Sequence, residues 1–294
     1  MVGTRNVAFP RLNASATGCI WRGNLSVCLR LLQHDPRCRV VSYPPLSGPQ
    51  FSPGKGVDVW AQMITFTEVS SLCVAVELVV TILKMRAPGM SLNRMPMFCW
   101  SMLVQSFMII FAMPAVMIAS TVFLLNDRTL GTHFVNPAEG GDPLLYQHVF
   151  WFFGHPEVYI IFLPALGMVS AILETHFAAP DLRLSGTGTV AGGQWLHRLR
   201  PLVHHMFATR TATIGEAYFT AASMMIAITS GVQIFCWLAT LWSGQASNDH
   251  GRPLRFRVHL HFRDGGMTAS SSRRSLSISR LTTRFSSWRI FTTC

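Results

Sequence analysis

Four long apolar stretches constrain the fold of this chain more than any other feature. They run over residues 57–84, 97–125, 147–173 and 218–242. Each meets the length of about 20 mostly apolar residues that a helix needs to cross a bilayer. Because each span must satisfy its own backbone hydrogen bonds in lipid, we expect an all-α, multi-pass transmembrane helical bundle. Half of the 294 residues are hydrophobic and only 13% are charged, which excludes an ordinary soluble domain.

The four stretches differ in how many polar residues they carry. Glu68 and Glu77 interrupt the first stretch, and an acidic residue at the bilayer centre costs about 2.5–3.5 kcal/mol on insertion scales. The second is apolar apart from Gln105, and its Pro114 predicts a kink. The fourth contains Gln233 among serines and threonines. The first stretch is therefore the weakest predicted span.

Ionisable side chains gather in one turn of the third stretch, at His155-Pro156-Glu157-Val158-Tyr159. Such groups are costly at bilayer depth, so they usually mark a functional site or a proton path. Positions 155 and 159 are four residues apart, so a helix places the imidazole and the phenol on one face. His204 and His205 stand together beside another apolar segment. Three imidazoles from two segments suit copper, zinc or iron, although a buried histidine satisfied by a neighbour would explain any one of them.

At these motifs the sequence resembles subunit I of cytochrome c oxidase, in the haem–copper oxygen reductase family. The resemblance implies a partial version of that family's twelve-helix fold, with the four stretches as its fourth, fifth, sixth and eighth helices. The matching segments, in family order, are VAFPRLN from Val7, YPPLSGPQFSPG from Tyr43, MRAPGM from Met85, GGDPLLYQHVFWFFGHPEVYIIFLPALGMV from Gly140, HHMF from His204 and AYFTAASMMIAITSGVQIFCWLATLW from Ala217.

The resemblance also implies a function and a set of site residues. His155, His204 and His205 would be copper ligands, Tyr159 would be joined covalently to His155, and Glu157 would relay protons. Copper and haem would be the cofactors of a proton pump that passes electrons from cytochrome c to oxygen. Quinol oxidases share the copper-site motifs, so quinol stays open as the electron donor.

The resemblance further implies a place in the cell and a set of partners. We expect an integral, multi-pass protein of a bacterial plasma membrane or a mitochondrial inner membrane. Its partners would be subunits II and III, cytochrome c through the assembled complex, and the lipid membrane, with no nucleic acid.

Several positions depart from the family's pattern. Gln233 stands where the family has a proton-path lysine, Asn6 where it has an entrance aspartate, and Arg210 where it has glycine. We expect the haem axial histidines to be missing, because the chain begins after the family's second helix and lacks the in-frame tenth-helix sequence. His259 and His261 mimic the tenth-helix spacing, but four arginines surround them, so we interpret the match as coincidence.

Three stretches, 14–40, 181–202 and 245–294, are Arg-rich and show no helical or strand periodicity. The last could be read as a tail that binds RNA or anionic lipid. We therefore divide the sequence into five segments. They are a degraded N-terminal segment (1–56), the spans with the histidine motif (57–180), a second degraded segment (181–203), the histidine pair with the span that follows it (204–244) and an aberrant basic tail (245–294).

A damaged reading frame would explain the basic stretches. Suppose that the reading frame is shifted, so that each codon consists of the last base of one residue's codon and the first two bases of the next residue's codon. In that frame, the genetic code allows the DNA for Leu281–Cys294 to encode HDTFFVVAHLHYV, the sequence that the family has in its tenth helix. The segment Gln194–Leu202, read one base later, permits SGFIGFGLW, and Gly18–Arg22 permits WLYLA. We therefore hypothesise a truncated, frameshift-damaged copy that is, as written, a non-catalytic membrane fragment. Copper binding should be weak, because Pro201 and the charged residues before it replace an apolar helix.

Membrane insertion should be uneven among the four spans. We expect 97–125, 147–173 and 218–242 to integrate readily and 57–84 to be marginal, because two carboxyl groups must leave water. The combined changes Glu68→Gly and Glu77→Asn should remove most of that penalty. Glycosylation mapping of each span in microsomes measures this, and equal efficiency for 57–84 and 147–173 would contradict it.

Overall fold

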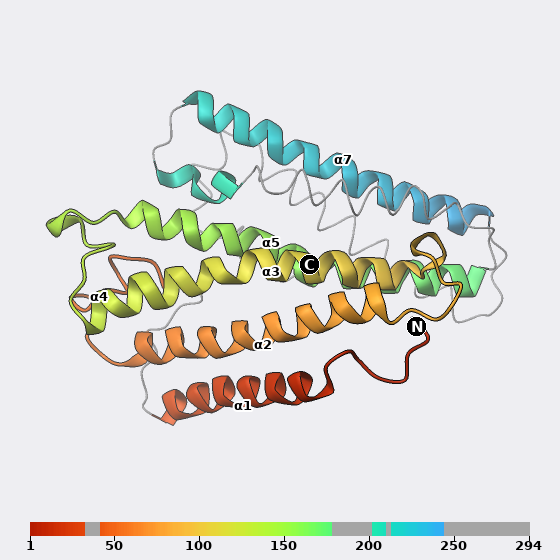
Figure 1. Cartoon of the computed structure of the whole chain (residues 1–294). Helices are drawn as coiled ribbons and strands as arrows, with labels where there is room; N and C mark the ends of the chain where they lie inside the picture. Colours follow the sequence, from red (N-terminus) through yellow and green to blue (C-terminus); the bar gives the residue numbers. More distant parts are fainter. Residues whose placement is uncertain (33–41, 178–201, 210–212, 244–294) are drawn as a thin grey trace. The chain divides into compact units, whose positions relative to one another are not determined.

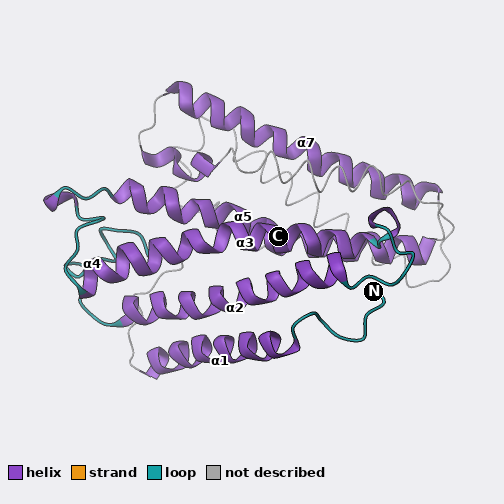
Figure 2. Ribbon diagram, viewed as in Figure 1, coloured by secondary structure: helices purple, strands orange, loops and turns teal. Residues whose placement is uncertain are grey.

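The computed structural model describes residues 1–32, 42–177, 202–209 and 213–243, and every regular element in these ranges is a helix (Figure 2). The all-α expectation is confirmed for this part of the chain. The elements, labelled as in Figure 1, are α1 (Pro10–Leu32), α2 (Gly56–Lys84), η1 (Leu92–Arg94), α3 (Met97–Met117), η2 (Ile118–Leu125), α4 (Asn126–Thr129), η3 (Pro137–Glu139), α5 (Pro143–Phe177), η4 (Leu202–Thr209) and α7 (Thr213–Ser243).

The chain divides into two compact units, which are described separately. Unit 1 comprises Met1–Met95 and Met102–Ile161, and unit 2 comprises Pro96–Ser101 and Phe162–Cys294. The boundary falls inside α3 and inside α5, so each of these helices contributes one part to each unit.

All four predicted spans are helices of membrane-crossing length. The candidate spans are Gly56–Lys84, Met97–Thr129, Pro143–Glu174 and Ile214–Thr240. The predicted limits of the first agree to within one residue, whereas the third begins four residues earlier than the apolar pattern indicated. Helix α5 starts there because the Asp142 carboxylate accepts a hydrogen bond from the Leu144 backbone amide at 2.8 Å, which caps the helix before its apolar run begins.

The two glutamates of α2 are buried inside the protein. Glu68 is 6% exposed and Glu77 is 2% exposed. Glu77 shares a face with Ser70 and Thr81, which are seven residues before it and four after it, and this face packs on the N-terminal segment. The Ser70 hydroxyl donates to the Ala16 carbonyl at 2.8 Å, and the Thr81 hydroxyl accepts from the Ala8 amide at 2.9 Å. These four polar side chains of the first span, at Glu68, Ser70, Glu77 and Thr81, are therefore turned toward protein.

Helix α1 includes residues 14–32, although the sequence shows no helical periodicity there. These residues continue a helix that begins at Pro10 and packs along α2 (Figure 1). The contact depends on small residues: Ala16 is fully buried, and a Cβ at Gly23 would lie 3.1 Å from the Thr67 hydroxyl. Because the buried stripe is narrow and made of small side chains, it leaves no apolar periodicity in the sequence. Residues 33–40 lie outside the described part.

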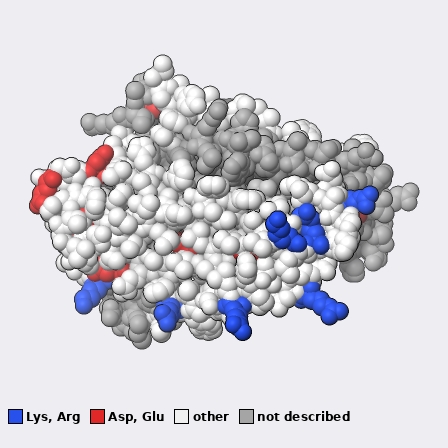
Figure 3. Space-filling view, viewed as in Figure 1, with Lys and Arg blue, Asp and Glu red and all other residues white. Residues whose placement is uncertain are grey.

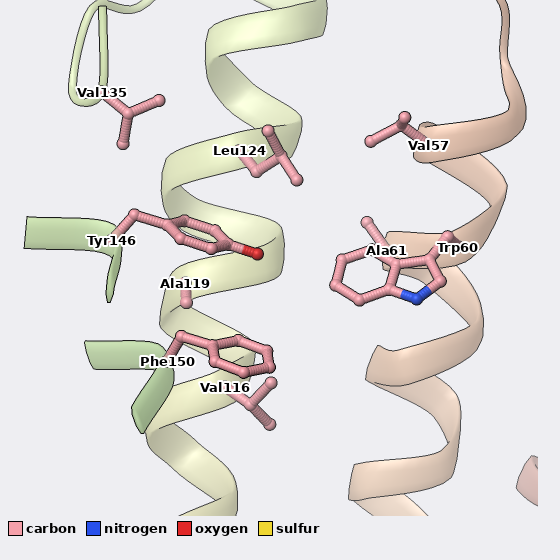
Figure 4. Close-up of a cluster of buried hydrophobic side chains, with 9 residues drawn as sticks. All are labelled: Val57, Trp60, Ala61, Val116, Ala119, Leu124, Val135, Tyr146 and Phe150. Carbon is pink, nitrogen blue, oxygen red and sulfur yellow. The ribbon is translucent and has the colours of Figure 1, made fainter. Parts of the chain in front are cut away.

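An aromatic and aliphatic cluster forms the core of unit 1 and joins α2, the C-terminal part of the second span and the start of α5 (Figure 4). Tyr146 and Phe150, one turn apart on α5, stack with ring centroids 6.0 Å apart. Both contribute to the same cluster as Trp60 of α2. The other members of the cluster are Val57, Ala61, Val116, Ala119, Leu124 and Val135.

The second span changes its hydrogen-bond pattern after its proline. Pro114 lies inside α3, where it offers no amide hydrogen to the preceding turn. The α-helix ends three residues later, at Met117, and a π-helical stretch follows over Ile118–Leu125. Ser120 stabilises this stretch by donating its hydroxyl to the Val116 carbonyl at 2.7 Å. The irregularity expected from the proline therefore takes the form of a local π-helix, which proteins often place near functional sites.

Arg128 ties three segments of unit 1 together at the end of the second span. Its guanidinium forms an ion pair with Asp58 in the first turn of α2, and the arginine side chain is only 4% exposed. The same group donates to the carbonyls of Ser47, Ser52 and Gly54 at 2.6, 2.9 and 2.8 Å. The loop before α2 thus closes over the end of the bundle through one cation.

Removing the Arg128 guanidinium should destabilise unit 1 strongly. Arg128→Met leaves Asp58 without its partner and three carbonyls without donors. We expect a loss of about 3 kcal/mol, at the lower end for breaking a buried pair, because Asp58 keeps partial contact with solvent. SDS titration in mixed micelles, followed by circular dichroism, measures the change.

The matched control is His133→Gln, which removes one partner of the exposed His133–Glu139 pair. An exposed pair contributes about 0–1 kcal/mol, so this variant should unfold close to the unchanged chain. Equal midpoints for the Arg128 and His133 variants would contradict the structural role given to Arg128.

Candidate functional site

The histidine motif lies on α5, within unit 1, in the turn that follows the aromatic core. Pro156 removes one helical hydrogen bond here, since a proline at this position cannot donate to the carbonyl of Phe152. The helix nevertheless continues without a break to Phe177. His155 therefore stands on a regular helix and is 2% exposed.

The imidazole of His155 and the phenol of Tyr159 lie side by side. Their ring centroids are 4.7 Å apart and the ring planes meet at 75°. The prediction that positions 155 and 159 share one helical face is confirmed by this contact. The geometry brings a nitrogen ligand and a phenol, which can donate both a proton and an electron, into van der Waals contact inside an apolar wall.

A cage of aromatic rings supports this turn. A Cβ added at Gly154 would lie 2.7 Å from the Trp151 ring, so only glycine lets that indole lie flat against the helix beside His155. The Tyr43 ring meets Trp151 edge-on at 6.4 Å. Burial raises the pKa of the Tyr43 phenol above its ordinary value. Tyr43 therefore stays protonated and neutral.

A second carboxyl lies in the surroundings of Glu157, which the motif did not predict. Glu68 of α2 lies near enough for its charge to interact with that of Glu157. One carboxylate oxygen of each is buried and has no hydrogen-bond partner among the described residues. The sequence showed Glu68 only as an interruption of an apolar span, so its position beside the motif could not be predicted.

The histidine pair belongs to unit 2 and stands on the short 3₁₀-helix η4. The rings of His204 and His205 are tilted by 40°, with centroids 4.2 Å apart. Both side chains are half-buried, whereas the next residue, Met206, is 2% exposed. Met206 departs from helical backbone angles, with φ −120° and ψ 20°. The pair therefore stands on one irregular turn, next to the buried side chain of Met206.

Other contacts inside unit 2 position α5 and α7. The Trp237 indole donates to the Ser170 hydroxyl at 3.0 Å, and both groups are buried. Gly167 allows the start of α3 to approach α5, because a Cβ there would lie 2.1 Å from the Ser101 hydroxyl.

The remaining predicted positions have different surroundings. Gln233 is 3% exposed on α7, so a polar group is buried where the family has its lysine. Asn6 is exposed, and its side-chain oxygen accepts from the Val7 amide at 2.9 Å, as a turn residue does. Arg210, His259 and His261 lie outside the described residues, as do Pro201 and the charged residues before it.

Four membrane-length helices, one of which carries a buried histidine in contact with a half-buried tyrosine, define a multi-pass helical membrane protein with a candidate transition-metal site. The chain belongs to the cytochrome c and quinol oxidase polypeptide I family, whose model matches residues 1–270. It is also similar to cytochrome c oxidase subunit 1 of Synechocystis, with 38% identity over 273 residues. These findings confirm the family that the motifs indicated and the integral membrane location.

The extent of the match adds two facts. The similar region covers 91% of this chain but 48% of the Synechocystis subunit, so the chain spans about half the length of that relative. The family match also runs through residues 14–40 and 181–202 and reaches into the basic tail. The reading-frame hypothesis for these stretches stays a prediction for the nucleotide sequence.

Proposed function

We propose that this chain supplies the copper-binding part of a haem–copper oxidase subunit I. The observation that carries the proposal is the contact between His155 and Tyr159 on α5, in a chain of this family. A buried histidine in contact with a half-buried phenol at membrane depth needs a functional reason, since polar groups are costly there.

The donor chemistry fits a copper ion. Membership of the family implies His155 of unit 1 and His204 and His205 of unit 2 as the ligand set, and every donor would be an imidazole nitrogen. Imidazole suits copper, and a set of three leaves a coordination position for a further ligand. In the family the copper, facing a haem iron, supplies the electron chemistry of oxygen reduction.

The other residues of the turn would handle protons. Tyr159, in contact with the His155 ring, would donate a proton and an electron next to the metal. Glu157 would hold a proton at the carboxylate oxygen that has no partner among the described residues. The aromatic cage of Trp151 and Tyr43 would keep water from this turn.

The partners follow from the same proposal. A subunit I works in an assembled membrane complex, so we propose subunits II and III as neighbours and cytochrome c as the electron donor through that complex. The matched family covers quinol oxidases as well, so quinol is the alternative donor.

Copper content tests the ligand set. We expect the purified chain to bind copper weakly, in less than equimolar amount, because two of the three ligands stand on one irregular turn and loosely supported ligands lose affinity. His155→Ala should lower the bound copper at least about tenfold, as loss of a metal-site partner does. Atomic absorption after gel filtration measures the ratio.

The control for this test is His148→Ala, which removes an exposed histidine from the same helix, two turns earlier. It should leave the bound copper unchanged. Equal losses in the two variants would contradict the ligand assignment. Tight, equimolar copper that depends on His155 would support the assignment and contradict the expected weakness.

A second candidate function is a membrane fragment without catalysis, and the residues at the two expected proton routes favour it. Exposed Asn6 and buried Gln233 replace groups that can ionise with groups that cannot, which would impair both routes. We expect no oxygen reduction by this chain, even with partner subunits supplied.

Complementation of an oxidase-deficient membrane measures this expectation. The chain as written should give oxygen uptake no higher than the empty vector, whereas a frame-repaired gene should restore it. Uptake from the unrepaired chain above the vector control would contradict the fragment.

A further inference from the structure

We propose that one end of unit 1 is a binding surface for the anionic headgroups of membrane phospholipids. This surface, here called the basic end, is formed by the N-terminal segment 1–11 and by the last turn of α2 with the loop that follows it, residues 82–95. These two segments contain five cationic residues and no acidic one. The cationic residues are Arg5, Arg11, Lys84, Arg86 and Arg94.

Backbone contacts join the two segments of the basic end. The Ala87 amide donates to the Val2 carbonyl at 2.9 Å, and the Ala8 amide donates to the Thr81 hydroxyl at 2.9 Å. Residue 3 is a glycine because a Cβ there would lie 2.6 Å from the Cβ of Ala87. Since Val2 and Ala8 are both attached to the end of α2, Arg5 between them is held close to it.

Most of these cations are available to a ligand. Arg5, Arg11, Lys84 and Arg94 are exposed. The ion pairs among the described residues are formed elsewhere, by Arg128 and by His133. An unneutralised group of like charges is a surface that favours an anionic partner.

Arg86 plays a different part in the basic end. Its guanidinium donates to the carbonyls of Met90 and Ile82 at 3.0 and 2.8 Å, so it closes the end of α2 and fixes the loop. Arg86 therefore shapes the surface and adds its charge, while the exposed cations remain for the headgroups.

The position of the basic end along the spans matches the headgroup layer. Lys84 is the last residue of one candidate span and Met97 is the first of the next, so the loop between them lies at one membrane surface. Apolar side chains are exposed beside the charges: Phe9, Met85 and Leu92 are 44%, 37% and 36% exposed. Cations flanked by exposed apolar side chains suit a lipid interface, where both kinds of group find partners.

The opposite end of unit 1 carries a surplus of acidic residues. Segments 42–58 and 126–142 carry four acidic residues against two cationic ones. In Figure 3 most of the visible acidic atoms lie toward the end of the molecule where Figure 1 labels α4. A surplus of Lys and Arg in a short loop between spans marks the side that faces the cytoplasm, where anionic lipids give the surface a negative potential. The basic end therefore faces the leaflet that attracts it.

Lipid retention tests the proposal. The full chain, purified in a neutral detergent, is incubated with phosphatidylglycerol or phosphatidylcholine, and bound lipid is measured by native mass spectrometry across a salt series. We expect preferential retention of phosphatidylglycerol that weakens as salt rises. The combined changes Arg5→Gln, Lys84→Gln and Arg94→Gln should lower the affinity for phosphatidylglycerol about 100-fold, because the loss of each cation should lower it about fivefold.

Matched single changes keep the test independent of folding. Lys84→Gln should lower phosphatidylglycerol affinity about fivefold. Lys55→Gln, the same change at an exposed lysine at the opposite end, should leave it unchanged. Circular dichroism confirms that both variants keep their helices. Equal effects of the two changes, or equal retention of the two lipids, would overturn the proposal.

Two further probes separate lipid from other anions. Inorganic phosphate should not compete with phosphatidylglycerol at equal concentration, because it lacks the acyl chains that Phe9, Met85 and Leu92 would contact. A short single-stranded RNA should bind no better to the unchanged chain than to the triple variant. The ligand of this surface would be a soluble anion and not a lipid if phosphate alone competed, or if the triple variant lost RNA binding that the unchanged chain shows. Either result would overturn the proposal.

Discussion

The absence of water from the bilayer core is the constraint on which the rest of this structure depends. A polar group in hydrocarbon must find its partner inside the protein, so the described elements are helices whose backbones satisfy themselves. The same constraint turns Glu68 and Glu77 inward, where α1 and α5 lie, although they interrupt an otherwise apolar span. Many of the side chains left facing outward along the spans, such as Phe111 and Phe235, are apolar.

That constraint also makes the candidate site recognisable. His155 is nearly fully buried and lies against Tyr159, while Glu157 and Glu68 approach each other from two helices. Each of these groups costs free energy at membrane depth. The stability of a helical bundle does not require any of them. At the end of the bundle, where Arg128 binds Asp58 and three carbonyls, a buried charge is explained by structure alone. In the described part of the chain, no comparable set of partners surrounds Glu157.

The sequence predicted the features that depend on local pattern. Four apolar stretches predicted four spans, and the spacing of His155 and Tyr159 predicted their contact. Features that depend on contacts between distant segments were not predicted. Helix α1 packs through Ala16 and Gly23, which carry no hydrophobic period, and Glu68 of α2 lies near enough to Glu157 of α5 for their charges to interact. The π-helical turn after Pro114 likewise needs the backbone geometry, since sequence identifies only the missing amide hydrogen.

The two halves of the proposed copper site differ in how firmly each is held. His155 stands on a helix of 35 residues, with Trp151 seated over Gly154 on one side and Tyr159 on the other. His204 and His205 stand on eight residues of 3₁₀-helix that contain a non-helical position at Met206. Because a metal site is only as strong as the support of its least ordered ligands, the proposed affinity of this chain for copper would be set by η4 rather than by α5. A change that stabilises η4 would therefore strengthen the site more than any change around His155.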